Sequence, residues 1–114
     1  MPEPKARERQ GLDAAVLDEI VRRVVAVAQP ERIILFGSAA RDEMGPHSDV
    51  DLLVVKAGEY RKRELARRLY VELGEVDAAV DVVLVTPEEV ERFRESHALV
   101  IKPALREGRV IYVA

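Results

Sequence analysis

The spacing of apolar residues divides the chain into alternating helices and strands. From Asp13 to about residue 28 apolar pairs recur every three to four residues, which predicts an amphipathic helix with Asp13 at its N-cap. Gln29-Pro30 ends that helix, because the residue before a proline avoids helical geometry. Runs of consecutive apolar, largely β-branched residues predict strands at 32–36, 49–55, 79–85 and 109–113.

Further helices are predicted between these strands. Residues 60–73 carry a leucine at every fourth position, and Gly74 stands at the expected C-cap. The run Thr86-Pro87-Glu88-Glu89 has threonine at the N-cap, proline at the first helical position and glutamate three residues after the cap. It predicts a short helix to about residue 95. Another helix is expected over 97–107, ended by Gly108.

The order of these elements predicts an α/β (α+β) fold with a small mixed β-sheet flanked by helices. Residues 1–11, with two prolines and alternating charges, are expected to form a flexible tail, and residues 12–114 a single domain. Strands 49–55 and 79–85 are apolar on both faces, so we expect helices to cover the sheet widely.

Composition narrows the classes of function. The chain has 114 residues, 48% apolar and 34% charged, which is typical of one soluble domain. The net charge of -3 argues against direct binding of nucleic acid. The absence of cysteine excludes disulfides, thiolate metal sites and cysteine nucleophiles. No apolar run approaches the roughly 20 residues that span a membrane, so we expect a cytoplasmic protein without membrane contact.

Two carboxylates, Asp49 and Asp51, stand one residue apart where a predicted strand begins. Side chains alternate along a strand, so both point to one face with Cα atoms about 6.6 Å apart. They can converge on one or two divalent cations, and oxygen ligands without a histidine or cysteine cluster favour magnesium or manganese over zinc. The alternative is a strand entry that faces water. The apolar residues 52–55 follow at once, which favours the metal site.

A glycine-serine turn, Gly37-Ser38, directly follows strand 32–36. Glycine permits a positive φ and close backbone approach. Ser38 can cap a short helix that contains Ala39 to Arg41, where its hydroxyl and nearby N–H groups can hold phosphate oxygens. Arg41 could reach the same anion. Taken alone, the same sequence is also that of an ordinary strand-to-helix turn.

A third carboxylate, Asp81, lies within the apolar strand 79–85. We expect it to be buried there, where an ionised group costs several kcal/mol unless it is paired or binds a metal. One interpretation is a salt bridge to an arginine. The other is that this strand lies beside the Asp49–Asp51 strand. Asp81 would then ligate a cation and act as general base toward an attacking hydroxyl.

Together these residues resemble the motif of the nucleotidyltransferase superfamily related to polymerase β. The shared features are Gly-Ser, an arginine three residues after the serine, Ser48-Asp49-Val50-Asp51-Leu52, and the strand residue Asp81 thirty residues later. The short length is similar to that of minimal nucleotidyltransferase (MNT) proteins, and residues 105–112 look like the end of such chains. Asp42 departs from the pattern, since relatives often carry glycine there.

The resemblance implies a polymerase β-like nucleotidyltransferase fold and the transfer of a nucleoside monophosphate from an NTP, with pyrophosphate leaving. ATP is the implied donor and two Mg²⁺ ions the implied cofactor, with Mn²⁺ as a substitute. The implied catalytic and metal-binding residues are Asp49, Asp51 and Asp81. The implied nucleotide-binding residues are Gly37, Ser38, Arg41 and Ser48.

The same resemblance implies a partner. Minimal members are commonly paired with a HEPN-domain protein, which implies a type VII-like antitoxin that transfers AMP to a tyrosine of a HEPN toxin. We expect the acceptor to come from another molecule, because few residues remain for an acceptor domain. A non-catalytic antitoxin that neutralises its partner by binding, and a transferase acting on a small molecule or an RNA end, are the alternatives. A homodimer and a hetero-oligomer are both open.

The remaining polar features have two interpretations each. The residues of the predicted helix 60–73 include a basic surface that is either a solvated face or a contact for a partner or RNA. It consists of Arg61, Lys62, Arg63, Arg67 and Arg68. His47, in the loop before Ser48, is either a solvated residue or a contact to the nucleotide. Base preference cannot be read from the chain.

Overall fold

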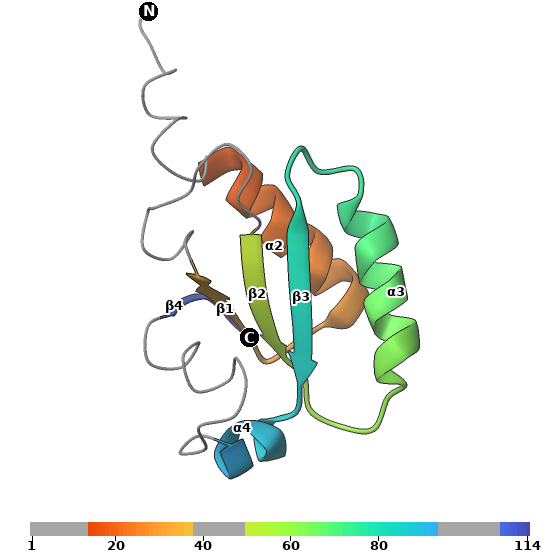
Figure 1. Cartoon of the computed structure of the whole chain (residues 1–114), viewed down its shortest axis with the longest axis vertical. Coiled ribbons are helices and arrows are strands. Elements are labelled where there is room, and N and C mark those ends of the chain that lie inside the picture. The colour runs from red at the N-terminus through yellow and green to blue at the C-terminus, as the bar shows by residue number, and fades with distance from the viewer. Residues whose placement is uncertain (1–13, 38–49, 94–107) are drawn as a thin grey trace, which may run out of the picture.

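The computed structural model describes residues 14–37, 50–93 and 108–114. Three helices and four strands lie in these ranges (Figure 1). In chain order they are α2 (Ala14–Ala28), β1 (Arg32–Phe36), β2 (Val50–Val55), α3 (Lys62–Leu73), β3 (Val80–Val85), α4 (Pro87–Phe93) and β4 (Arg109–Val113). No helix in these ranges is both long and apolar enough to cross a membrane.

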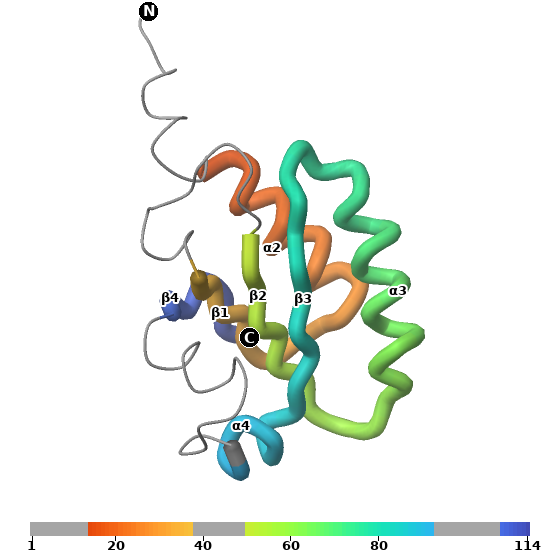
Figure 2. The backbone as a smooth tube through the Cα atoms, in the orientation of Figure 1, coloured from red at the N-terminus to blue at the C-terminus, as the bar shows by residue number. Residues whose placement is uncertain are grey.

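The strands form one mixed sheet in the order β3-β2-β1-β4. β1 runs antiparallel to both β2 and β4, and β2 runs parallel to β3. The parallel pair is joined through α3, as the tube in Figure 2 shows. β3 is therefore an edge strand and β2 a central one. The predicted mixed sheet and its four strands are confirmed. β3 begins one residue later than predicted, and residue 49, the first of another predicted strand, lies outside the described ranges.

The larger hydrophobic core lies between the sheet and the helices α2 and α3. The helical periodicity places Ile20, Val24 and Ala28 on the buried side of α2. The leucines of α3, at every fourth position, face the same core. They pack against strand residues of one parity, including Leu52 and Val54. The apolar stripes seen in the sequence thus determine which face of the sheet these two helices cover.

The opposite face of the sheet carries a second, smaller core. Ile34, Leu53 and Val55 are buried there, together with Val85 and Val90. Val90 belongs to α4, which Figure 1 shows at the C-terminal end of β3. Apolar residues on both faces are therefore confirmed. Within the described ranges, however, the two long helices share one face and the second face meets only the short α4.

Helix ends follow the sequence signals in most places. Thr86 and Glu89 form the predicted capping box, with the Glu89 N–H donating to Thr86 Oγ1 at 3.1 Å and the Thr86 N–H donating to Glu89 Oε1 at 2.9 Å. α3 begins two residues later than predicted, at Lys62, and Gly74 caps it in a right-handed conformation. The helices expected after Ser38 and over 97–107 lie outside the described residues.

An arginine of α2 connects that helix to the end of α3. Arg23 donates to the Glu72 carboxylate at 2.8 Å and to the Glu72 carbonyl at 3.2 Å, and it pairs with Glu19 and Glu75. The hydrogen bond that Arg23 donates to Glu19, together with the charges of Glu19, Glu72 and Glu75, raises the pKa of Arg23 above its ordinary value. The contact orients the two helices over one face of the sheet.

Candidate active site at the start of the parallel strands

Two of the three predicted carboxylates lie side by side. Asp51 and Asp81 are each the second residue of their strand, and they are register partners across the parallel β2–β3 pair. Paired residues on neighbouring strands project from the same face of the sheet. That face is the one with the smaller core, because Leu53 and Val83 have the same parity. The prediction that Asp81 lies beside the Asp51 strand is confirmed.

The expectation that Asp81 is buried is wrong. Its side chain is exposed, whereas Asp51 is half-buried. The physical reason is position: Asp81 is next to the first residue of β3, and β3 is an edge strand. The cost of burying a charge therefore cannot support a metal site at Asp81. The register with Asp51 carries that argument instead.

Gly37 completes this group from β1. Its φ is +76°, a left-handed conformation that glycine adopts readily and other residues do not. The antiparallel register places Phe36 opposite Asp51, so Gly37 lies at the same end of the sheet. A Cβ atom at position 37 would come within 2.5 Å of Asp51 Oδ2. The Asp51 carboxylate thus occupies space that exists only because residue 37 has no side chain.

These residues supply oxygen donors on one face at one end of the sheet. Two neighbouring carboxylates beside a turn without a side chain suit a hard divalent cation and a phosphate that approaches the backbone. Within the described ranges, no group of three or more histidine, cysteine or acidic residues converges on a possible metal position. The third predicted carboxylate, Asp49, lies outside those ranges, as do Ser38, Arg41 and Ser48.

A tyrosine that the sequence did not single out contacts this strand edge. The Tyr70 hydroxyl accepts a hydrogen bond from the Val82 N–H at 3.0 Å, next to Asp81. The open edge of β3 is thereby capped by a side chain of α3. Tyr70 does not follow the leucine stripe of its helix, and at 43% exposure it is one of the large exposed apolar residues. The sequence holds no signal for the contact between Tyr70 and β3, because the exposure of Tyr70 is visible only in the structure.

Comparison with known proteins decides the family. The family model described as "Nucleotidyltransferase domain" matches residues 17–111. The chain belongs to the nucleotidyltransferase domain family. The match spans all seven helices and strands of the described ranges except the first residues of α2 and the last of β4. No curated protein matches this nucleotidyltransferase chain in sequence.

Solved structures share the fold. A candidate nucleotidyltransferase from Sulfolobus solfataricus is 21% identical with a TM-score of 0.59, over 98% of this chain and 90% of that one. A toxin-antitoxin complex with AMP-PNP gives 21% and 0.52, over 85% and 73%. A complex of a tri-AMPylated Shewanella oneidensis HEPN toxin with an MNT antitoxin gives 20% and 0.50, over 88% and 71%. At these identities the likeness establishes the nucleotidyltransferase fold.

Proposed function

We propose that this nucleotidyltransferase moves AMP from ATP to a hydroxyl of a partner protein, in a reaction that needs a divalent cation. The observation that carries the proposal is the pairing of Asp51 with Asp81 across two parallel strands. The Asp51 carboxylate lies against Gly37, which has no side chain. The nucleotidyltransferase family model spans all three of these positions, which supports the proposal.

The donor set fits Mg²⁺ or Mn²⁺. In our proposal Asp51 and Asp49 hold the cation or cations, with Asp81 as the third ligand. All three contribute carboxylate oxygen, which these ions prefer. A bound cation would neutralise charge on the phosphates and on the leaving pyrophosphate. Gly37 and Ser38 would hold the phosphates by their backbone N–H groups, with Arg41 and Ser48 as further contacts.

The proposed transfer step uses these residues. The acceptor oxygen attacks the α-phosphorus of ATP, a new phosphoester bond forms, the α–β phosphoanhydride bond breaks and pyrophosphate leaves. Asp81 takes the proton of the acceptor hydroxyl. The exposure of Asp81 on an edge strand suits this role, because an acceptor delivered by another molecule must reach the base from solvent.

The proposed acceptor is a tyrosine of a HEPN-domain toxin. One neighbour of the same fold is found with a HEPN toxin that carries AMP groups, and another contains an ATP analogue. An AMP group on a toxin tyrosine adds bulk and negative charge, which would oppose binding of an RNA phosphate. The chain would then be an antitoxin that silences its partner by covalent modification.

Labelled ATP tests the proposal. The chain is purified together with a HEPN-domain protein and incubated with α-labelled ATP and Mg²⁺. We expect label on the partner, loss of label with EDTA, and at least about a hundredfold slower labelling in Asp51→Asn. Asp77→Asn, an exposed aspartate on the loop before β3, is the matched control and should label normally.

Two results separate the possible failures. Labelling by Asp51→Asn at the rate of the unchanged chain would overturn the assignment of the site. A folded Asp51→Asn that no longer labels the partner but still neutralises it would show that neutralisation occurs by binding, and would overturn the proposed mechanism of silencing.

A further inference from the structure

A pocket lies at the opposite end of the sheet from Gly37 and Asp51. Its volume is about 320 Å³, and it is formed between the end of α2, the start of α3 and the chain that follows β2. Pockets of roughly 300–1,000 Å³ are the size that holds small organic ligands. The residues that line it are Val27, Ala28, Gln29, Lys56, Tyr60, Arg61, Glu64, Leu65 and Arg68.

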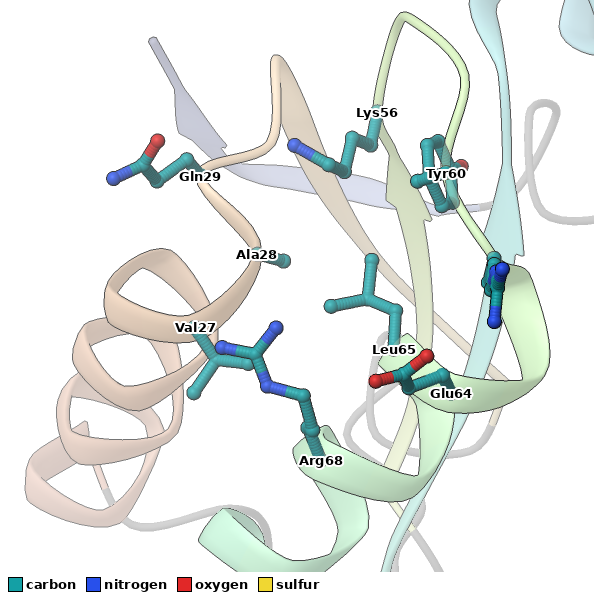
Figure 3. A pocket seen from close by; sticks show the side chains of 9 residues that line it. Val27, Ala28, Gln29, Lys56, Tyr60, Glu64, Leu65 and Arg68 are labelled. Atoms are coloured by element: carbon teal, nitrogen blue, oxygen red, sulfur yellow. The ribbon is translucent and has the colours of Figure 1, made fainter.

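The lining separates into an apolar part and a cationic part. Val27, Ala28 and Leu65 supply aliphatic surface. Figure 3 shows Lys56 and Arg68 reaching toward the end of α2 from two sides, with Ala28 and Leu65 between them. A ligand in this space would touch aliphatic carbon and two cations at once.

The charges of the pocket do not cancel. Among the lining residues the three cations Lys56, Arg61 and Arg68 outnumber one carboxylate, Glu64, by two, in a chain whose net charge is -3. The Glu31 carboxylate lies outside the lining and accepts from the Ala57 N–H. No ion pair of Arg61, Arg68 or Glu64 is found in the part of the chain that the structure describes. A phosphate monoester carries about 1.5 to 2 negative charges at neutral pH, which matches this excess better than a single carboxylate does.

Compensation of the α2 dipole explains only part of this cluster. α2 has no basic residue in its last turn, so cations from elsewhere are favourable near its C-terminal carbonyls. That helix end is equivalent to only about half a negative charge. One cation is enough to match it, and three are present.

Tyr60 adds an aromatic wall. The Lys56 ammonium lies 5.7 Å from the centre of the Tyr60 ring, and the Tyr60 hydroxyl donates to the Val85 carbonyl at 3.5 Å. Burial raises the pKa of the Tyr60 hydroxyl, so the ring is neutral at physiological pH. An aromatic ring beside aliphatic surface favours a ligand with a flat or apolar body.

We propose that this pocket binds a small organic phosphate, with the phosphate held between Lys56 and Arg68 and the apolar body on Val27, Ala28 and Leu65. The site is about 17 Å from Asp51, from the rise along β2 and the residue after it. It is therefore separate from the proposed transfer site and does not depend on that assignment.

Calorimetric titration of the full chain in EDTA tests the proposal, since EDTA removes the cation that the transfer site requires. Phenyl phosphate, inorganic phosphate and AMP are the probes. We expect phenyl phosphate or AMP to bind at least about tenfold more tightly than inorganic phosphate, because the apolar body adds buried surface. Tighter binding of AMP than of phenyl phosphate would identify the ligand as a nucleotide, and the reverse a simpler aromatic phosphate.

Variants locate the binding. Arg68→Gln and Lys56→Gln should each weaken phenyl phosphate binding by about tenfold or more, since each removes a charged hydrogen-bond donor. Arg63→Gln is the matched control, because Arg63 is exposed on the same helix and does not line the pocket. Amide chemical-shift changes should concentrate at 27–29 and 60–68.

Three outcomes would overturn the proposal. They are equal affinity for phenyl phosphate and inorganic phosphate, unchanged affinity in both Lys56→Gln and Arg68→Gln, and shift changes centred on Gly37 and Asp51. Absence of binding by all three probes would also overturn it, and a lower melting temperature in Arg68→Gln would then assign the cations to the helix ends alone.

Discussion

The two ends of β2 differ in charge and in construction. At the start of the strand, Asp51 lies beside Asp81 and against a glycine in a left-handed conformation. Just past its end, Lys56 lines a pocket with Arg61 and Arg68. At the first end, the Asp51 carboxylate lies close to the Gly37 backbone. At the second end, a capping box and the Lys62–Glu89 ion pair hold the ends of α3 and α4.

The contrast indicates that activity and stability are separable in this chain. A change at the carboxylate end should alter the chemistry and leave the pocket intact. A change among the caps and ion pairs at the other end should alter the free energy of unfolding and leave transfer unaffected.

Gly37→Ala should have the largest effect. A Cβ atom there meets Asp51 Oδ2 at 2.5 Å, so the carboxylate must move, and misplacement by about 1 Å can cost a hundredfold in rate. We expect labelling of the partner to fall by about a hundredfold or more, measured with α-labelled ATP, while phenyl phosphate affinity stays the same.

Gly58→Ala is the control for backbone strain in that experiment. Gly58 also has a positive φ, +95°, but nothing lies within 4 Å of the Cβ position. It should lose stability, by roughly 1–2 kcal/mol for a left-handed alanine, without loss of transfer. Equal losses of labelling in both variants would mean that strain, and not the Asp51 contact, accounts for the result at Gly37.

The helices and strands could be predicted because their signals are local. The leucine repeat of α3, the apolar strand runs and the capping box at Thr86 each depend on neighbours in sequence. That the strand of Asp81 lies beside the strand of Asp51 was one of two interpretations of the sequence, and the parallel pairing and its register were not predicted. The positive φ of Gly37 was predicted from its residue type. Its close approach to Asp51 depends on the register of β1 with β2, which the sequence does not show.

What could not be predicted depends on tertiary packing. The exposure of Asp81 arises because β3 is an edge strand, and strand order is not written in the periodicity of one strand. The pocket is lined by residues from two distant segments, 27–29 and 56–68. In the sequence of α3 and the residue before it, Arg61 and Arg68 have the spacing of an ordinary solvated helix face. The basic surface of that helix is exposed, and only Arg61 and Arg68 of it line the pocket.

Thr86→Ala should produce a smaller change, at the opposite end of the sheet from Gly37. It removes the hydroxyl that accepts from the Glu89 N–H, and loss of such a cap costs about 1 kcal/mol. Urea unfolding should show this loss, and partner labelling should be unchanged. Thr86→Ser keeps the hydroxyl and should retain most of the stability. A matching loss in Thr86→Ser would point to the methyl group and away from the cap.

Gln29→Gly should stabilise the chain slightly. Gln29 follows α2 with a φ of +50°, and its N–H donates to the Val25 carbonyl at 3.0 Å, the position where glycine is favoured. Glycine removes the strain of the left-handed conformation but has more conformational entropy in the unfolded chain, so we expect a net gain of roughly 0.5 kcal/mol in unfolding free energy. Gln29→Ala retains the strain and should change little.

Lys62→Met should have the smallest effect, and one that depends on pH. Lys62 donates to both oxygens of Glu89, at 2.7 and 2.8 Å, and this bond lowers the pKa of Glu89 below its usual 4.5. A lowered carboxyl pKa contributes stability that is present above the unfolded value of about 4.5 and is lost as pH falls through the folded value. The pair is partly exposed, so we expect only a few tenths of a kcal/mol at pH 7.

Urea unfolding of Lys62→Met and of the unchanged chain should therefore differ at pH 7 and converge at acid pH, below the folded pKa of Glu89. Arg63→Met removes a cation from the same helix and has no ion pair in the described ranges, so its difference from the unchanged chain should be smaller at pH 7. A Lys62→Met difference that persists unchanged at acid pH would show that the lysine stem packs against α4 and that the charge contributes nothing. The α3–α4 contact would then belong to the apolar construction of this end of the sheet.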